Sequence, residues 1–511
     1  MKKFLPLVLF SFIFILANCK KNDDDIVPQG PEPEPEEVEL QNEVNDFVWD
    51  AMNTWYFWND EVVELGDDRF ADKNAYFNFL NGFDTPRGLF QTLRSPKDRF
   101  SVFVDDYDIL FNAFSGVVKT NGIEFVLTRP PEGGNKVVGV VRYIINGSDA
   151  AAKDIKRGDI FYAVDGVELF AETDEQGNIT NSNLDLLNPD TFTLNFAEIS
   201  SDDMTVPNDV NIEFTKTELT ENPVLISKSM EVNGTNIGYL MYNSFTRGFD
   251  DELNNAFGEL KNEGVTELVL DLRYNLGGSG LSAQRLCSMI TGQFEGELLS
   301  KDTWNDNWNN IFGSEDLFVD TIGETPINSL NLDKVYIIAT DDSASASEYV
   351  LNNLAPYIDV IHIGDVTVGK NQLSVTLVDN PDQVFSSNGE PDLPLPYIVL
   401  SQDAGFTTVE DANPNHKFAI QPIVGTNENA DGFGEFTDGL QPDFMLLETL
   451  GNLGQLGEQG EPLLDLAIEQ ITGVSSKSSK STVSENMKIR TVSSSNRRKP
   501  FRDILVYDMQ Q

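Results

Sequence analysis

The sequence predicts a multidomain α/β protein, α+β overall, in which a small helical region and a β-rich region precede a larger α/β region. Residues 41–115 show helical periodicity with clustered aromatic side chains. Residues 116–220 carry short β-branched runs divided by glycines and prolines, a pattern typical of strands joined by turns. From 221 to 473, apolar strand-like runs alternate with helical segments. This alternation predicts βαβ units and a largely parallel sheet.

The first 18 residues are typical of a secretory signal. Two lysines precede the run FLPLVLFSFIFILA, which is shorter than the about 20 apolar residues that a membrane-spanning helix needs. The run ends at LANC (16–19), which resembles a bacterial lipoprotein signal. In such proteins the cysteine, here Cys19, is lipidated. A plain signal peptide with a chance cysteine is the alternative.

The composition of residues 19–40 predicts an extended tether. They begin with KKNDDD after Cys19, which resembles the acidic tag of surface lipoproteins of the Bacteroidetes type, and they contain PQGPEPEPEE. Proline and glutamate keep such a segment extended. We therefore expect a cell-envelope lipoprotein of the outer membrane, periplasmic or surface-exposed, that contacts the membrane through its N-terminal lipid anchor only.

Composition excludes several classes of function. The chain has 511 residues, and its formal charge of −48 argues against nucleic acid as a partner, because phosphate binding needs basic surface. Cys19 and Cys287 are the two cysteines, so the sequence offers neither a disulfide framework nor a cysteine metal site. Residues 474–511 are Ser-rich and locally basic, and we expect them to be a disordered tail.

The segment DDSASASEYV (341–350) places three serines between a predicted buried strand and a predicted helix. A hydroxyl at that position faces the free amides and positive end of the helix, which favour developing negative charge. Ser345 and Glu348 also fit a capping box, in which the two side chains satisfy orphan amides without any chemistry. The pattern alone therefore leaves both capping and catalysis open.

A nucleophilic serine needs a base. The chain has two histidines, His362 in a predicted strand and His416 in a predicted loop, and no G-x-S-x-G motif, which argues against a Ser–His–Asp triad. Lysine is the other base available to serine when burial lowers its pKa. Lys370 ends the uncharged stretch TVGK, where it is either such a base or an exposed cation.

Four motifs in order resemble the C-terminal-processing (tail-specific) serine proteases, a family that uses a Ser–Lys dyad. They are DLRYNLGG (271–278), SASASE (343–348), GDVTVGK (364–370) and DGLQPD (438–443). Lys370 follows Ser345 by 25 positions, the spacing typical of that family. The resemblance covers roughly 116–450 and, more loosely, 41–115.

The resemblance assigns catalytic roles. Ser345 would be the nucleophile and Lys370 the general base. The backbone amides of Gly278 and Ala346 would form the oxyanion hole. Glu348 would be either a third catalytic residue that holds the lysine or only a helix cap.

Two positions depart from the family pattern. Pro356 stands where some relatives carry an aspartate, and GKNQ replaces the GKG of many relatives near Asn371. The alternative function is therefore a catalytically inactive peptide-binding lipoprotein on the same scaffold.

The resemblance also implies the fold of each region. Residues 41–115 would be a helical N-terminal domain, 116–220 a PDZ-like domain and 221–473 a crotonase-like spiral α/β catalytic domain. GIEFVL would supply the loop whose amides receive a peptide's C-terminal carboxylate. The expected substrate-binding residues are Gly122, Ile123, Glu124 and Phe125. Without the resemblance, GIEFVL would be predicted to form an ordinary strand.

We thus expect a membrane-anchored serine endopeptidase that acts on C-terminal segments of polypeptides, without a cofactor. NENADGFGEFTD (427–438) resembles a calcium-binding loop, but Asn427 and Asp438 replace the expected first and last ligands. We therefore predict no metal site.

Overall fold

The structure is a computed structural model, and it describes residues 37–66, 69–380, 397–400, 412–450, 453–474 and 489–495. The expected signal peptide, Cys19 and most of the tether lie outside the described residues. Within the described ranges, no helix has the length and apolar character needed to span a bilayer.

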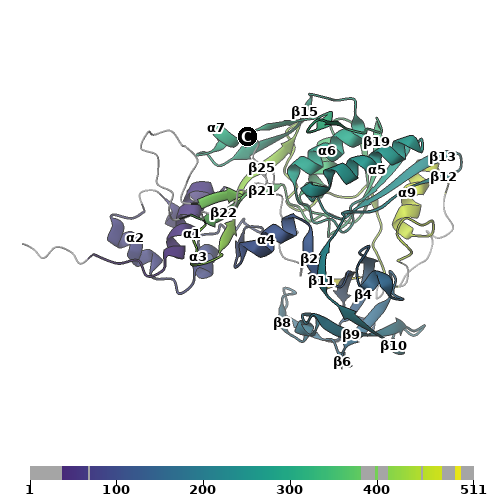
Figure 1. The fold of residues 1–511 in the computed structure, drawn as a ribbon, viewed down its shortest axis with the longest axis horizontal. Helices are drawn as coiled ribbons and strands as arrows, with labels where there is room; N and C mark the ends of the chain where they lie inside the picture. Colours follow the sequence, from purple (N-terminus) through teal and green to yellow (C-terminus); the bar gives the residue numbers. More distant parts are fainter. Residues whose placement is uncertain are drawn as a thin grey trace, which may run out of the picture.

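The fold class predicted from the sequence is confirmed: the chain is a mixed α/β protein of several parts with a helical N-terminal region (Figure 1). In Figure 1 the helices α1, α2 and α3 lie at one end of the molecule. A large sheet covered by α5 and α6 lies at the other end, and the β-rich sheet with β4, β9 and β10 lies below it.

The N-terminal region contains α1 (Glu43–Trp55), η1 (Asn59–Glu61), η2 (Val63–Leu65), α2 (Lys73–Leu80), α3 (Pro86–Thr92), β1 (Val102–Val104) and α4 (Tyr107–Phe114). The Asn42 side chain caps α1 by accepting a hydrogen bond from an amide in its first turn. The Trp55 ring at the end of α1 stacks on Trp308, with centroids 4.8 Å apart. This region therefore shares its core with the later α/β region.

Residues 116–220, called the β-rich module below, contain ten strands and two short helices. They are β2 (Val117–Thr120), β3 (Ile123–Thr128), β4 (Val138–Ile144), η3 (Ala150–Ala152), β5 (Ile160–Val164), β6 (Val167–Glu168), β7 (Ala171–Thr173), β8 (Ile179–Ser182), η4 (Leu184–Leu187), β9 (Thr191–Ile199), β10 (Thr205–Thr215) and β11 (Thr217–Thr220). The main sheet has the order β10-β9-β5-β4-β3-β27. Phe161, Leu194 and Phe214 form part of a core whose buried members all come from this module.

The prediction of a disordered tail over residues 474–511 is wrong for its described part. Strand β27 (Thr491–Ser494) pairs antiparallel with β3. The other side of β3 is bound to β4, so β27 supplies hydrogen-bonding partners to an edge that would otherwise lack them. Ile489 and Val492 pack against apolar side chains of the β-rich module.

A six-stranded sheet organises the α/β region, with the order β12-β13-β14-β19-β20-β26. Its strands are β12 (Val224–Val232), β13 (Thr235–Tyr242), β14 (Glu267–Asp271), β19 (Lys334–Ala339), β20 (Asp359–Gly364) and β26 (Phe444–Met445). β12 pairs antiparallel with β13, and the other neighbours are parallel.

Helices cover both faces of this sheet because side chains of a strand point alternately to opposite sides. Leu268 and Leu270 share a core with α5 (Asp250–Asn262), α6 (Gly280–Thr291) and α8 (Ala346–Leu354). Val269 shares a second core with α9 (Pro462–Thr472). The near-continuous apolar sequence of β14 follows from this double burial.

The remaining elements are η5 (Arg247–Phe249), β15 (Leu298–Trp304), α7 (Asn309–Phe312), β16 (Glu315–Leu317), β17 (Thr321–Ile322), β18 (Thr325–Pro326), β21 (Gln372–Ser374), β22 (Thr376–Asp379), β23 (Tyr397–Leu400), β24 (Ala419–Gln421) and β25 (Ile423–Asn429). They form two further four-stranded sheets, β16-β15-β25-β21 and β1-β24-β22-β23, and the β17–β18 pair. The second four-stranded sheet includes β1, so the helical region is joined to the α/β region through a sheet as well as a core.

Candidate active site

Two of the predicted motifs meet at one edge of the six-stranded sheet. β14 and β19 are parallel neighbours, and their carboxyl ends lead into DLRYNLGG and SASASE. Ser343 Oγ donates to Leu272 O at 2.8 Å, and Ser347 Oγ donates to Asn275 O at 2.8 Å. The outer two serines therefore fix the two loops to each other.

Ser345 differs from both neighbouring serines. It precedes α8 with φ +59° and ψ −112°, a left-handed conformation that disfavours residues with a Cβ. Its hydroxyl is buried and donates no hydrogen bond to a described residue, although it faces the Glu348 amide as the N-cap of a capping box. A strained residue at a strand-to-helix turn is how hydrolases often expose a nucleophile, and Ser345 has this backbone arrangement.

Lys370 is buried, with 1% of its surface exposed, so its interpretation as an exposed cation is wrong. Its Nζ lies 5.1 Å from the centroid of the Phe100 ring, which comes from the N-terminal region. The neighbouring Arg99 donates hydrogen bonds to Val368 O at 3.1 Å and to Thr437 O at 2.9 Å. The N-terminal region thus covers the segment that carries the predicted base.

Glu348 connects the serine loop to the lysine segment. Its Oε2 accepts hydrogen bonds from the backbone amides of Ser345 and Lys370, both at 2.8 Å. Its Oε1 accepts from Gly369 N at 2.6 Å and from Thr367 Oγ1 at 2.5 Å. One carboxylate therefore caps α8 and also holds the main chain of Lys370.

Burial raises the pKa of Glu348 above its ordinary value, and the hydrogen bonds from Thr367 and Lys370 act in the opposite direction. All four contacts require the carboxylate to accept. They make Glu348 a positioning residue for Ser345 and Lys370.

The glycine pair of DLRYNLGG lies against Ser345. A Cβ on Gly277 would come within 2.8 Å of Ser345 Cβ, and a Cβ on Gly278 would come within 2.3 Å of Phe245 O. Phe245 N donates to Gly277 O and Phe245 O accepts from Ser279 N, at 3.0 and 2.8 Å. Because this parallel bridge uses the residues on either side, the Gly278 amide points away from Phe245.

Ala346 is the first residue of α8, where an amide has no acceptor within its own helix. Ala346 follows Ser345 directly, and Gly278 follows the glycine that contacts it; the oxyanion hole formed by their amides stays a prediction. The contact of Gly277 with the serine was not predicted, although the doubled glycine was a signal for close backbone approach.

Buried charges lie behind the two loops. Arg142 of β4 forms an ion pair with Asp342, with an N–O distance of 2.5 Å. Arg157 and Arg273 both bind Glu448, and Tyr274 of DLRYNLGG donates to the same carboxylate. Sequence reasoning missed this cluster, because its members come from distant motifs with no shared local pattern.

The predicted carboxylate-binding loop lies in the β-rich module, away from this site. Gly122 has φ +89°, and a Cβ there would lie 1.9 Å from Ser148 Oγ, so the position requires glycine. Gly122 N donates to Thr120 Oγ1 at 3.0 Å, and Ile123 N donates to Asn121 Oδ1 at 3.1 Å. An incoming carboxylate therefore has to replace side-chain acceptors of the loop itself.

The last two residues of this loop contact the C-terminal segment. Phe125 N donates to Ser495 Oγ at 2.7 Å, and the Ser495 hydroxyl lies 2.7 Å from Glu124 Oε2. The four predicted substrate-binding residues are thus already engaged within the chain.

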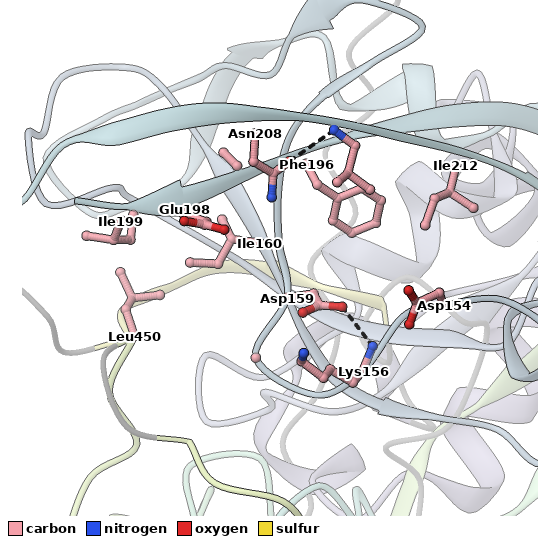
Figure 2. A pocket seen from close by; sticks show the side chains of 13 residues that line it. Asp154, Lys156, Asp159, Ile160, Phe196, Glu198, Ile199, Asn208, Ile212 and Leu450 are labelled. Atoms are coloured by element: carbon pink, nitrogen blue, oxygen red, sulfur yellow. Dashed lines mark hydrogen bonds between the residues drawn. The ribbon is translucent and has the colours of Figure 1, made fainter.

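A cavity of about 480 Å³ opens on the β-rich module rather than at Ser345 (Figure 2). Ile160, Phe196 and Ile212 line it on the sheet side, and Leu450 closes one end. None of these residues was a predicted site residue. The cavity thus has no part in the predicted chemistry.

No three His, Cys, Asp or Glu residues are grouped in the described part of the chain so as to hold a metal ion. In the calcium-like stretch, Asn427 lies in β25 and its side chain binds Asp302 and Asn353. Its carboxamide is therefore engaged by protein groups.

Comparison with known proteins adds to this geometry. The sequence model of peptidase family S41 matches residues 236–386, and that of the peptidase S41 N-terminal domain matches residues 43–102. The chain carries peptidase S41 domains. The larger match contains Gly278, Ser345 and Lys370.

Two curated relatives of these S41 domains match part of the chain. A carboxyl-terminal-processing protease of Picosynechococcus is 26% identical over 176 residues, which cover 34% of this chain and 37% of the relative. Carboxyl-terminal-processing peptidase 3 of Arabidopsis thaliana, a chloroplast protein, is 29% identical over 160 residues, covering 29% and 26%. The match therefore spans about a quarter to a third of the length of these relatives.

The S41 fold extends over most of the chain. The structure of a Bacteroides fragilis protein assigned to the S41 proteases superposes with a TM-score of 0.63 at 22% identity. It covers 86% of this chain and 99% of that protein. This likeness supports the fold class and leaves the roles of individual residues as predictions.

Proposed function

We propose that the chain is a serine endopeptidase with a Ser345–Lys370 dyad. Ser345 attacks the scissile carbonyl, and Lys370 takes the hydroxyl proton and returns it to the leaving amine. The backbone amides of Gly278 and Ala346 stabilise the oxyanion, and loss of one such donor typically costs about 10²–10³ in rate. Glu348 holds the nucleophile and the base in position.

The contrast among the three serines of SASASE carries this proposal. Ser343 and Ser347 donate hydrogen bonds that close the loops. Ser345 has a strained backbone, and its buried hydroxyl donates to no acceptor in the described part of the chain. Glu348 binds the amides of both Ser345 and Lys370, which ties the two proposed catalytic residues together.

Polypeptides are the proposed substrates, recognised near their C-termini by the β-rich module acting as a PDZ-like domain. The names of the two curated relatives and the strand-accepting edge of β3 support this specificity. The proposed location is the outer membrane, through a lipid on Cys19. Its support is the signal-like sequence that ends at that cysteine.

Cleavage of an unstructured protein such as casein tests the chemistry. The full-length chain in detergent should fragment casein, Ser345→Ala and Lys370→Met should not, and Ser343→Ala should retain activity. Casein cleavage by the Ser345→Ala variant would show that Ser345 is not the nucleophile. An inert wild-type chain that still binds peptides would favour the inactive peptide-binding alternative.

Cell fractionation tests the anchor separately. Cys19→Ala should move the protein from the membrane fraction to the soluble fraction, because stable anchoring depends on the acyl chains. Wild-type protein that is extracted without detergent would contradict the anchor.

A further inference from the structure

The free edge of β3 carries a strand from the chain's own C-terminal segment. In the antiparallel pair, Thr491 lies opposite Thr128 and Ser494 lies opposite Val126. The strand therefore runs toward the loop that contains Gly122. This is strand addition, the mode in which PDZ-type modules bind extended peptides.

Side-chain hydrogen bonds fasten both ends of this strand. Thr128 Oγ1 donates to Arg490 O at 2.9 Å and accepts from Arg490 N at 3.1 Å. At the other end, the Ser495 hydroxyl lies 2.7 Å from Phe125 N, 3.1 Å from Phe125 O and 2.7 Å from Glu124 Oε2. The segment thus uses the backbone of Phe125, one of the four residues predicted to bind substrate.

Apolar contacts fix the register of the segment. Val492 packs against the core of the β-rich module, and Ile489 packs against the cluster that contains Val126 and Leu450. Ser494 is fully buried. Backbone pairing combined with apolar contacts at separate positions is how an added strand achieves specificity.

A cavity of about 140 Å³ adjoins this edge of β3 at Ser495, which is one of its lining residues. Lys119, Asn121 and Lys216 line the cavity together with Leu187 and Phe192. We call the edge and the cavity together the groove. A peptide that adds to β3 from outside needs the same backbone groups, because the opposite side of β3 is bound to β4. Occupancy by the C-terminal segment and by a second peptide is therefore mutually exclusive.

We infer that Ile489–Ser495 is a resident ligand of the β-rich module, which a substrate peptide must displace before it adds a strand to β3. The recognised ligand is an extended peptide with a β-branched apolar residue in the place of Val492 and a hydroxyl in the place of Ser495. The role of substrate in this inference rests on the proposed function; the occupancy does not.

A disulfide tests the occupancy directly. Val126 and Ser494 are opposite partners, and such Cα atoms lie about 4.5–5.5 Å apart, within the about 4.4–6.8 Å range of disulfides. In the full-length chain, Val126→Cys/Ser494→Cys should close into an intrachain disulfide, identified by mass spectrometry after proteolysis. Val126→Cys/Ser484→Cys is the matched control with a second cysteine in the same tail. Equal closure of the two pairs, or closure of neither, would overturn the inference.

Peptide binding tests the displacement. The probe is fluorescein-labelled IRTVSSS, the sequence of residues 489–495, and the background is Ser345→Ala, so that cleavage plays no part. Val492→Asp should expel the resident segment and bind the probe about tenfold more tightly or better, because the fraction of free grooves limits the apparent affinity. Val474→Asp, at a side chain that is 55% exposed, should leave the affinity unchanged.

The oxidised Val126→Cys/Ser494→Cys chain should lose probe binding, and reduction should restore it. Equal affinity of the oxidised and reduced chains would contradict a shared groove. Since these measurements use an inactive serine variant, a failure of casein cleavage leaves them valid. A negative result in these binding measurements likewise does not contradict the proposed Ser345–Lys370 dyad.

Discussion

Arg142 in β4 of the β-rich module forms a buried ion pair with Asp342, which lies in the chain three residues before Ser345. Their side chains are 6% and 0% exposed, and the Arg142 guanidinium lies 4.5 Å from the centroid of the Tyr274 ring. The β-rich module and the serine loop are therefore joined by a charge pair inside the protein. A displacement of β4 would act on the loop that carries the proposed nucleophile.

Arg142→Met should destabilise the protein strongly, because it leaves the Asp342 carboxylate buried without its cation. Breaking one partner of a buried pair typically costs about 3–5 kcal/mol. Urea denaturation should show a lower midpoint for Arg142→Met and a partial recovery in Arg142→Met/Asp342→Leu. A single variant with the wild-type midpoint would show that the pair carries little stability.

Glu348→Gln should lower kcat while the chain stays folded, since an amide nitrogen cannot accept two of the four hydrogen bonds that position Ser345 and Lys370. Burial raises the pKa of Glu348, so in the wild type these contacts weaken as the pH falls through that raised value. We expect Glu348→Gln to lose one acid-side step of the pH profile of kcat, while the dependence on a neutral Lys370, which the proposed mechanism requires, remains. An unchanged acid side of the profile in the variant would assign that step to another group.

The three serines of SASASE should separate stability from activity. Ser343→Ala and Ser347→Ala each remove a buried hydrogen bond between the two loops. Leu272 O and Asn275 O each keep a backbone donor, so we expect a loss of about 0.5–1.5 kcal/mol. Ser345→Ala removes only the weak N-cap contact of its hydroxyl with the Glu348 amide, so its thermal midpoint should lie closest to that of the wild type. Casein cleavage should be lost in Ser345→Ala and retained in Ser343→Ala and Ser347→Ala. A melt that ranks Ser345→Ala as the least stable of the three would contradict this assignment.

The free energy of unfolding should fall at acid pH as Glu448 becomes protonated. Burial, the largest effect, raises its pKa, but Arg157, Arg273 and Arg142 outweigh burial and lower the pKa to about 2. A carboxyl group with a depressed folded-state pKa contributes stability above its unfolded value of about 4.5. This contribution, about 3 kcal/mol, is lost as the pH falls from there toward 2.

Urea midpoints measured between pH 7 and pH 3 would test the acid dependence. Glu448→Gln should be less stable at pH 7 and should show a flatter pH dependence than the wild type. Parallel curves for the two proteins would assign the acid sensitivity to other carboxylates.

The sequence predicted those parts of the site that depend on sheet topology. DLRYNLGG and SASASE follow apolar runs that proved to be neighbouring parallel strands, so their loops meet. Local patterns also marked Ser345 and Glu348 as the start of a helix. The hydrogen bonds that Glu348 accepts from the lysine segment depend on how β20 packs beside α8, which no local pattern encodes.

Two features lay beyond sequence reasoning for different physical reasons. The pairing of Arg142 with Asp342 joins residues far apart in the chain, and each looks like an ordinary surface charge in its own segment. The strand β27 was missed because the polar composition of residues 474–511 obscured two apolar residues, Ile489 and Val492. Pairing with the free edge of β3 stabilises β27 more than the β-propensity of its own residues does.

The positive φ of Ser345 has a consequence for which residue natural selection favours at this position. At φ +59° a glycine would be free of the strain that serine carries, which is typically about 1–3 kcal/mol. In a lineage without use for the hydroxyl, a change to glycine would be a stabilising mutation open to neutral drift. In this chain a serine nevertheless occupies the positive-φ position that precedes α8. A serine at this position is what the proposed reaction requires, whereas peptide binding alone gives no reason for one.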